Sequence, residues 1–168
     1  MFMAMRDLRY FGDPVLKSPA DPVTTFDDST RALVDDLLDT VRAPGRAGLA
    51  APQIGVGLRA FSYNVDGAVG YVLNPEIVEL SEEKHEVMEG CLSVPELGFP
   101  TVRAAQATVK GVDLRNEPVT VSGDGLMAQC LQHEVDHLDG LLYLDRLTPE
   151  LRKEAFRQAR DKDWFWSR

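Results

Sequence analysis

Two of the three histidines in this 168-residue chain lie four positions apart, in the segment His133-Glu134-Val135-Asp136-His137. On an α-helix, residues i and i+4 lie on one face about one turn apart, so both imidazoles can bind one metal ion. Glu134 follows the first histidine, where its carboxylate can reach water at the metal without binding the metal itself. This H-E-x-x-H pattern is typical of zinc hydrolases. It predicts a helix with a metal centre on one face; the alternative is an amphipathic helix with surface histidines.

A hydrolytic site of this type needs a third protein ligand and one open coordination position. Glu150 and Glu154 lie downstream in what reads as a separate, exposed helix, and they are poor candidates. Cys130 is three residues before His133 on the same helix face, whereas Cys91 lies in a glycine-containing segment after a predicted strand. A thiolate is the better third ligand. Spacing alone does not choose between the two cysteines, because a buried cysteine is often only a small apolar side chain.

The composition is that of an acidic globular domain. Hydrophobic residues make up 44% of the chain, and 27 Asp and Glu against 18 Lys and Arg give a net charge of −9. Because this charge repels phosphate backbones and anionic lipid, we expect no DNA partner and no membrane partner. The length favours one domain over residues 1–168. Two cysteines without an export signal predict a cytoplasmic location, and Met1, Met3 and Met5 leave the start codon open.

The pattern of apolar residues predicts three helices separated by a block of short strands. Helical spacing covers residues 27–42, 126–138 and 148–161, and residues 48–57 read as a loop of small residues. The strand-like stretches are 58–65, 71–80, 84–88, 104–114 and 118–122. Because the strands do not alternate with helices, we expect an α+β fold. Its mainly antiparallel strands should pack around the central metal-binding helix, with one helix towards the N-terminus and one at the C-terminus.

Three segments of the chain together resemble the peptide deformylases. They are Gly48-Leu49-Ala50-Ala51-Pro52-Gln53, then Glu89-Gly90-Cys91-Leu92-Ser93, then Gln132-His133-Glu134-Val135-Asp136-His137. Their order and separations fit that family, and the resemblance extends over nearly the whole chain. One position departs from the pattern. The first motif of the family usually opens with Gly two residues before the Gly-Leu-Ala-Ala run, and here that position is Arg46.

The metal ligands that the resemblance implies are Cys91, His133 and His137. Cys130 then becomes a wall of a side-chain pocket, and we expect Glu89 to support its motif structurally. The implied cofactor is one divalent metal ion. The family resemblance favours Fe²⁺, and a donor set of one cysteine and two histidines also suits Zn²⁺, Ni²⁺ and Co²⁺.

The reaction that the resemblance implies is removal of the N-terminal formyl group from formyl-methionyl nascent polypeptides, with release of formate. Metal-bound hydroxide would attack the formyl carbon, with Glu134 as general acid and base. Gln53 and the backbone N–H of Leu92 would bind the developing oxyanion. Two other functions stay open as alternatives: a general zinc metalloprotease that uses the same helix, and a non-catalytic metal-binding module.

The substrate contacts are expected in an apolar pocket for the methionine side chain and along a groove that takes the peptide backbone as a strand. The candidates are Ala47, Gly48, Val87, Gly90, Leu126, Gln129 and Cys130. Arg46 reduces backbone freedom and adds a charge near this groove. It can therefore alter affinity or specificity, although it removes no catalytic group.

The end of the chain differs in charge from the rest. Residues 151–168 carry six Lys and Arg against three Asp and Glu, whereas residues 1–150 have a net charge of −12. Lys153, Arg157 and Arg160 fall at i, i+4 and i+7, which places them in one stripe on a helix. One interpretation is a solvated face attracted to the acidic body. The other, suggested by the resemblance, is a contact with ribosomal RNA near the exit of formylated chains. We expect a monomer.

Overall fold

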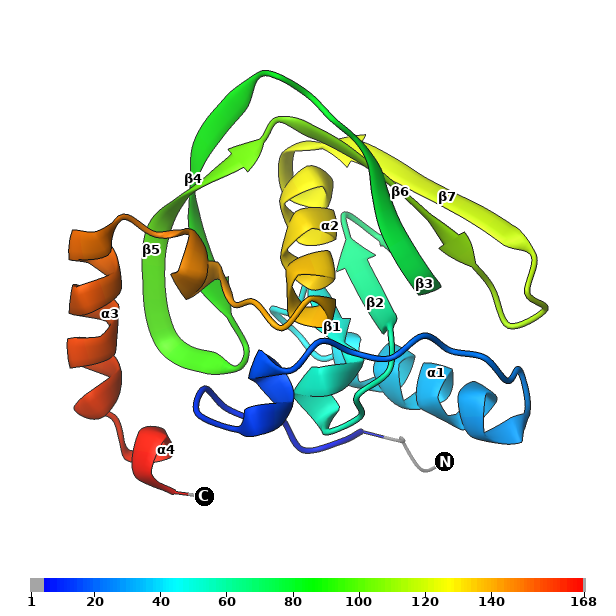
Figure 1. Ribbon diagram of the computed structural model, residues 1–168, viewed down its shortest axis with the longest axis horizontal. Coiled ribbons are helices and arrows are strands. Elements are labelled where there is room, and N and C mark those ends of the chain that lie inside the picture. The colour runs from blue at the N-terminus through cyan, green and yellow to red at the C-terminus, as the bar shows by residue number, and fades with distance from the viewer. Residues whose placement is uncertain (1–4, 168) are drawn as a thin grey trace.

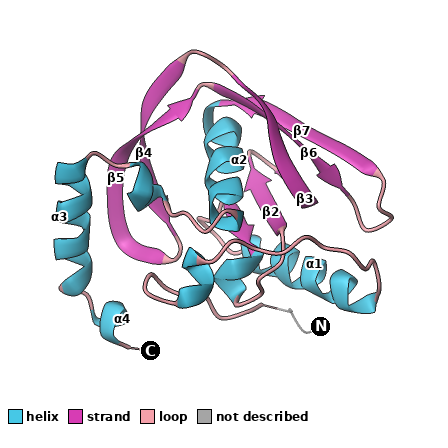
Figure 2. Cartoon of the chain, viewed as in Figure 1, coloured by secondary structure: helices cyan, strands magenta, loops and turns pink. Residues whose placement is uncertain are grey.

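A single helix, α2 (Gly125–Leu138), lies between two antiparallel sheets in the computed structural model, which describes residues 5–167 (Figure 1). One sheet has five strands in the order β1-β2-β3-β6-β7, and the other is the hairpin β4-β5. Figure 2 shows α1 (Asp28–Val41) and α3 (Pro149–Arg160) at opposite ends of the molecule. The α+β class and the antiparallel pairing are confirmed. Met1 and Met3, named above, and residue 168 at the end of the basic segment lie outside the described residues.

The strands agree with the predicted stretches apart from two additional strands, β1 and β5. The large sheet contains β1 (Gly48–Ala50), β2 (Ala60–Val65), β3 (Ala68–Leu80), β6 (Gln106–Val112) and β7 (Pro118–Asp124). The hairpin contains β4 (Lys84–Cys91) and β5 (Val94–Ala104). The sequence pattern did not predict β5, since two prolines within it argue against a strand. The segment predicted as a loop of small residues begins with the short strand β1.

The hairpin register places the functional end of β4. Glu89 pairs with Phe99 and Gly90 with Gly98, but Cys91 pairs with Val94, so residues 95–97 of β5 have no partner in the ladder. Such an irregularity bends a strand and turns side chains towards a site. Glu96 in this bulge has a φ of 69°. Cys91 is therefore presented from the last position of β4, beside a distorted turn.

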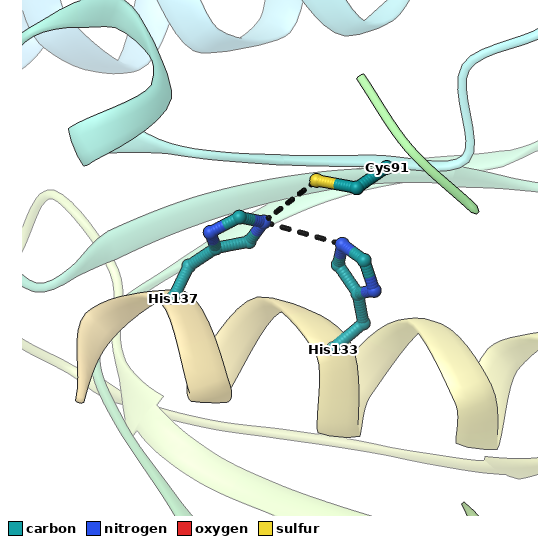
Figure 3. A group of neighbouring side chains, drawn as sticks. All are labelled: Cys91, His133 and His137. Carbon is teal, nitrogen blue, oxygen red and sulfur yellow. Dashed lines mark hydrogen bonds between the residues drawn. The ribbon is translucent and has the colours of Figure 1, made fainter. Parts of the chain in front are cut away.

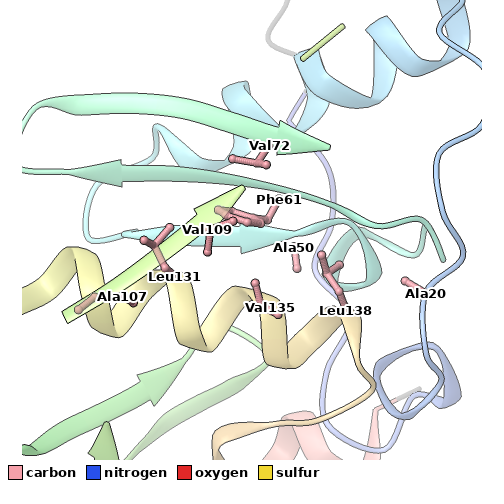
Figure 4. Close-up of a cluster of buried hydrophobic side chains, with 10 residues drawn as sticks. Ala20, Ala50, Phe61, Val72, Ala107, Val109, Leu131, Val135 and Leu138 are labelled. Carbon is pink, nitrogen blue, oxygen red and sulfur yellow. The ribbon is translucent and has the colours of Figure 1, made fainter. Parts of the chain in front are cut away.

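Helix α2 has two different buried faces. Leu131, Val135 and Leu138 recur at helical spacing and pack against the large sheet, where Phe61 and Val109 are fully buried (Figure 4). Burial of each such side chain stabilises the fold by about 1.5–3 kcal/mol. The polar residues of the H-E-x-x-H segment lie on other sides of the helix. The apolar stripe thus fixes which way the polar face of α2 points.

The first helix holds the segment that carries Gln53. Asp27 caps α1, because its side chain accepts hydrogen bonds from the backbone N–H groups of Ser29 and Thr30. Apolar residues of α1 share one buried cluster with the short 3-10 helix η2 (Ala51–Ile54), among them Leu37 and Ile54. Packing of α1 therefore fixes η2 against the sheet.

The C-terminal helix is part of the body of the protein. Ala155 and Ala159 on α3 are fully buried in a third apolar cluster with β5 and the 3-10 helix η3 (Tyr143–Arg146). Thr148 caps α3, its hydroxyl accepting from the N–H of Leu151. A short helix, α4 (Asp163–Trp166), follows. No helix within the described part of the chain combines the length and the apolar content that a bilayer crossing requires.

Candidate metal centre and active-site cavity

Three potential metal ligands converge between the end of β4 and the middle of α2. Nε2 of His137 lies 3.4 Å from Sγ of Cys91 and 3.2 Å from Nε2 of His133. The three ligand atoms all lie within 4.8 Å of one another (Figure 3). One thiolate and two imidazole nitrogens are a donor set that zinc and related transition metals accept. The residues present therefore fit a single metal ion.

His133 is oriented from behind by a carboxylate. Its Nδ1 lies 2.7 Å from Oε2 of Glu89, which leaves Nε2 facing the other ligands. Arg103 donates to both oxygens of Glu89, from Nε at 2.9 Å and from Nη2. Burial opposes ionisation of Glu89, but these hydrogen bonds lower the pKa of its carboxyl to about 2. Glu89 is therefore a charged support for the metal ligand.

The support continues to the protein surface. Arg103 also donates from Nη1 to Oδ2 of Asp136 at 2.8 Å. Arg146 of η3 donates to both oxygens of Asp136, at 2.7 and 3.2 Å. Arg103 and Asp136 are buried, whereas the side chain of Arg146 is 48% exposed. Alternating charges thus link η3 to His133, and each buried charge has an opposite partner.

Glu134 lies at the closest approach between α2 and β1. A Cβ atom added to Gly48 would lie 2.5 Å from Oε1 of Glu134 and 2.8 Å from Sγ of Cys130. Burial raises the pKa of the Glu134 carboxyl to about 7. Its Oε2 atom is buried and has no hydrogen-bond partner within residues 5–167. A carboxyl group with these properties can both accept and donate a proton near neutral pH.

Gln53 is held in one orientation by its carbonyl oxygen. Oε1 accepts a hydrogen bond from the N–H of Ala50 at 2.9 Å, so Nε2 points the opposite way. Nε2 donates to Oγ of Ser93 at 3.1 Å and lies 3.8 Å from Sγ of Cys91. The side-chain amide therefore presents its donors beside the metal ligand, at a site where only 1% of Gln53 is exposed.

These groups share one cavity of about 520 Å³. The candidate ligands Cys91 and His133 line it together with Gln53, Leu92 and Glu134. The predicted substrate contacts on its wall are Ala47, Gly48, Gly90, Leu126, Gln129 and Cys130. Ligand, proton-transfer and donor groups thus open onto a single space that reaches the surface.

Comparison with known proteins identifies the family of this chain. The model of the family described as polypeptide deformylase matches residues 5–153. A peptide deformylase of Acidothermus cellulolyticus is 55% identical over 163 residues, which are 96% of this chain and 89% of the relative. The chain belongs to the polypeptide deformylase family.

A second relative and a solved structure extend the comparison. Peptide deformylase 1 of Corynebacterium efficiens is 45% identical, with 97% of this chain and 99% of the relative aligned. The crystal structure of a peptide deformylase from Legionella pneumophila superimposes with a TM-score of 0.87 at 42% identity, covering 94% of both chains. The deformylase fold therefore spans nearly all of the described residues.

The structure separates one predicted residue of the deformylase site from the others. Val87 does not line the main cavity. It faces a separate space of about 30 Å³, which it shares with Gln129. Val87 and Glu89 point to the same side of β4, but Val87 lies two residues farther from Cys91 and meets α2 near its start, at Gly125 and Gln129.

The sequence pattern missed the residues behind the ligands. Arg103 and Arg146 belong to no motif of the sequence, and Asp136 occupies a variable position of the H-E-x-x-H pattern. One feature of the sequence does point to burial of Asp136: it lies on a predicted helix next to apolar positions that must be buried. Ser93, which accepts from Gln53, lies in the second deformylase motif and was not assigned a role.

Proposed function

We propose that this chain catalyses metal-dependent hydrolysis of the formyl group from N-formylmethionyl peptides, releasing formate and a free amino terminus. The observation that carries the proposal is the convergence of Cys91, His133 and His137, two of which line one cavity together with Glu134 and Gln53. Family membership supports the same reaction.

Cys91, His133 and His137 would hold the metal ion. When bound, a divalent ion supplies Lewis acidity, which polarises a carbonyl oxygen and makes water a stronger acid. We propose Fe²⁺ as the ion in the cell, with Zn²⁺, Ni²⁺ and Co²⁺ as ions that the same donors accept. Metal analysis of protein purified without oxygen, with activity measured on the same samples, tests this assignment.

Glu134 is the proposed proton carrier. Its carboxylate accepts a proton from the attacking water and then donates it to the nitrogen of the departing amine. A pKa of about 7 suits both transfers, because neither protonation state is strongly favoured at neutral pH. Oε2 of Glu134 forms no hydrogen bond within residues 5–167, so no neighbouring group competes with the substrate and water for its proton.

Gln53 and the backbone N–H of Leu92 are the proposed donors to the oxygen on which negative charge develops. Donors that are already oriented stabilise this charge without reorganisation during the reaction. The bond from Ala50 to Oε1 supplies that orientation for Gln53. An amide is also a neutral donor, so its role does not change with pH.

The methionine side chain is proposed to lie between Leu126, Gln129 and Cys130. Burial raises the pKa of the Cys130 thiol well above its usual value, so this wall stays uncharged. The peptide backbone would run along Ala47 and Gly48 on one side and Gly90 on the other. Val87 lines a separate small space with Gln129, so we propose that it supports Gln129 from behind.

The experiment that tests the proposal compares two substrates. Formate release from a formyl-methionyl peptide should be fast, whereas an N-acetylated peptide with an internal amide bond should not be cleaved. Cleavage of the internal bond would favour the metalloprotease, and inactivity of the metal-loaded protein on both substrates would favour the binding module. Neither alternative is favoured by the family match.

We also propose a cytoplasmic location and no DNA or membrane partner, on the basis of the net charge and the two thiols. The proposed organisation is a monomer with one domain over residues 1–168. The basic stripe of α3 is proposed to contact ribosomal RNA. Lys153 and Arg160 are exposed and form no ion pair within residues 5–167, whereas Arg157 pairs with Glu154. Two cations of the stripe are thus available to phosphate groups.

A further inference from the structure

Four charged side chains line the 520 Å³ cavity, and only two of them lie outside the metal-site machinery. Glu89 and Glu134 are buried and belong to that machinery. The other two are Arg46, in the loop before β1, and Glu96, in the bulge of β5. Both are at least partly exposed, so they lie where the cavity meets solvent.

Arg46 is a fixed cation. Its Nη1 donates to the backbone oxygen of Thr40 at 2.8 Å, in the last turn of α1, where helix carbonyls have no partner of their own. The remaining guanidinium donors form no ion pair with any carboxylate within residues 5–167. Arginine stays charged at all working pH values and keeps a planar set of donors.

Glu96 is already partly neutralised. Its carboxylate lies 3.9 Å from Nζ of Lys162, and 63% of its side chain is exposed. The cation of Arg46 is therefore the more localised charge at this end of the cavity. The other three charged side chains of the cavity are carboxylates, and the protein as a whole carries a net charge of −9.

A formylated peptide that occupied the cavity would extend towards its exposed wall, which includes Arg46 and Glu96. The formyl carbon belongs beside Glu134 and Gln53, so the residues that follow the first one extend towards the solvent end. We propose that Arg46 is a specificity-determining residue that favours formyl peptides with an aspartate or glutamate at the second or third position. This inference rests on the proposed function and names the substrate class that the same site prefers.

The test compares peptides that differ only in charge. Formyl-Met-Xaa-Ser-amide and formyl-Met-Ala-Xaa-amide are made with Asp or with Asn as Xaa, and kcat/KM is measured for each. Half-exposed ion pairs contribute factors of about 2 to 5, so Asp should be favoured over Asn by that ratio at one position. The ratio should fall towards 1 as salt is added.

Variants separate the charge from the fold. Arg46→Gln keeps a donor for the Thr40 carbonyl and should bring the Asp/Asn ratio to 1, while Arg46→Glu should bring it below 1. Arg42→Gln, which removes an exposed cation that pairs with Asp39 and is not part of the cavity lining, should leave the ratio unchanged.

Three results would overturn the inference. They are a wild-type ratio of 1 or less at both positions, a ratio that survives in Arg46→Gln, and an equal loss on both peptides that follows a loss of thermal stability. No turnover of the Asn peptides by the wild type would instead contradict the proposed function, and the inference with it.

Discussion

Oε2 of Glu89 lies 2.7 Å from Nδ1 of His133, and the same carboxylate accepts two hydrogen bonds from Arg103. A histidine that binds metal through one nitrogen is commonly held through the other, which fixes its tautomer and increases its basicity. Glu89 therefore joins the strand that ends in Cys91 to the helix that carries both histidines. The geometry of the metal site depends on the hairpin and the helix together.

The first prediction concerns this support. Glu89→Gln should weaken metal binding by about 10- to 100-fold, because a neutral amide orients the ring less strongly and leaves Arg103 short of one charge partner. Competition with a chelator measures the dissociation constant. Glu83→Gln is the matched control, since Glu83 is exposed, pairs with the exposed His85 and is not part of the metal site. Equal affinities for both variants would contradict the assignment.

The second prediction concerns Glu134. Glu134→Gln keeps the shape of the side chain but cannot accept a proton, and a positioned acid or base contributes about 10²- to 10⁴-fold to a rate. Metal content should stay near that of the wild type while formate release falls by this factor. A variant that retained activity would remove Glu134 from the mechanism.

The third prediction separates the two cysteines. Cys91→Ala should lose metal and activity together, because one ligand is gone. Cys130→Ala should keep the metal and mainly raise KM, since it shortens a wall of the proposed pocket. Metal analysis after dialysis distinguishes the two. If loss of Cys130 were the change that removed the metal, the ligand assignment would be wrong.

The fourth prediction concerns the contact of β1 with α2. Gly48→Ala would place a methyl group 2.5 Å from Oε1 of Glu134 and should displace that carboxylate. A displacement of about 1 Å in an active site can cost about 10²-fold in rate. Gly57→Ala is the control, because a Cβ there meets nothing within 4 Å. Similar rates for both variants would show that Glu134 tolerates the shift.

The central features of the site could be predicted because local geometry determines them. The spacing of His133 and His137 places both rings on one face of any helix, whatever surrounds it. The apolar stripe at Leu131, Val135 and Leu138 similarly predicts which face of α2 is buried. The choice of Cys91 over Cys130 needed the resemblance, since both cysteines satisfy the spacing. In the structure, Cys91 is the one grouped with both histidines.

The residues that could not be predicted depend on pairing between distant segments. Arg103 lies on β5, which contains two prolines and therefore does not read as a strand in the sequence. Its partners come from β4 and α2. No local pattern indicates that Arg103 faces Glu89, because this follows from the hairpin register. The separate position of Val87 has the same origin, since strand alternation predicts its side but not what that side contacts.

The last prediction concerns the basic stripe on α3. Deleting this helix would expose the buried face that carries Ala155 and Ala159, so charge reversal is the cleaner change. Lys153→Glu with Arg160→Glu should abolish co-sedimentation with ribosomes at low salt, because attraction to phosphate becomes repulsion. Wild-type binding itself should fall steeply as salt rises.

Reversal of Arg31 and Arg115, two exposed cations on α1 and in the β6–β7 turn, is the control and should leave binding intact. Activity on a short formylated peptide should persist in both double variants, since neither pair lines the cavity. Equal sedimentation of the two double variants, or none by the wild type, would reject the contact.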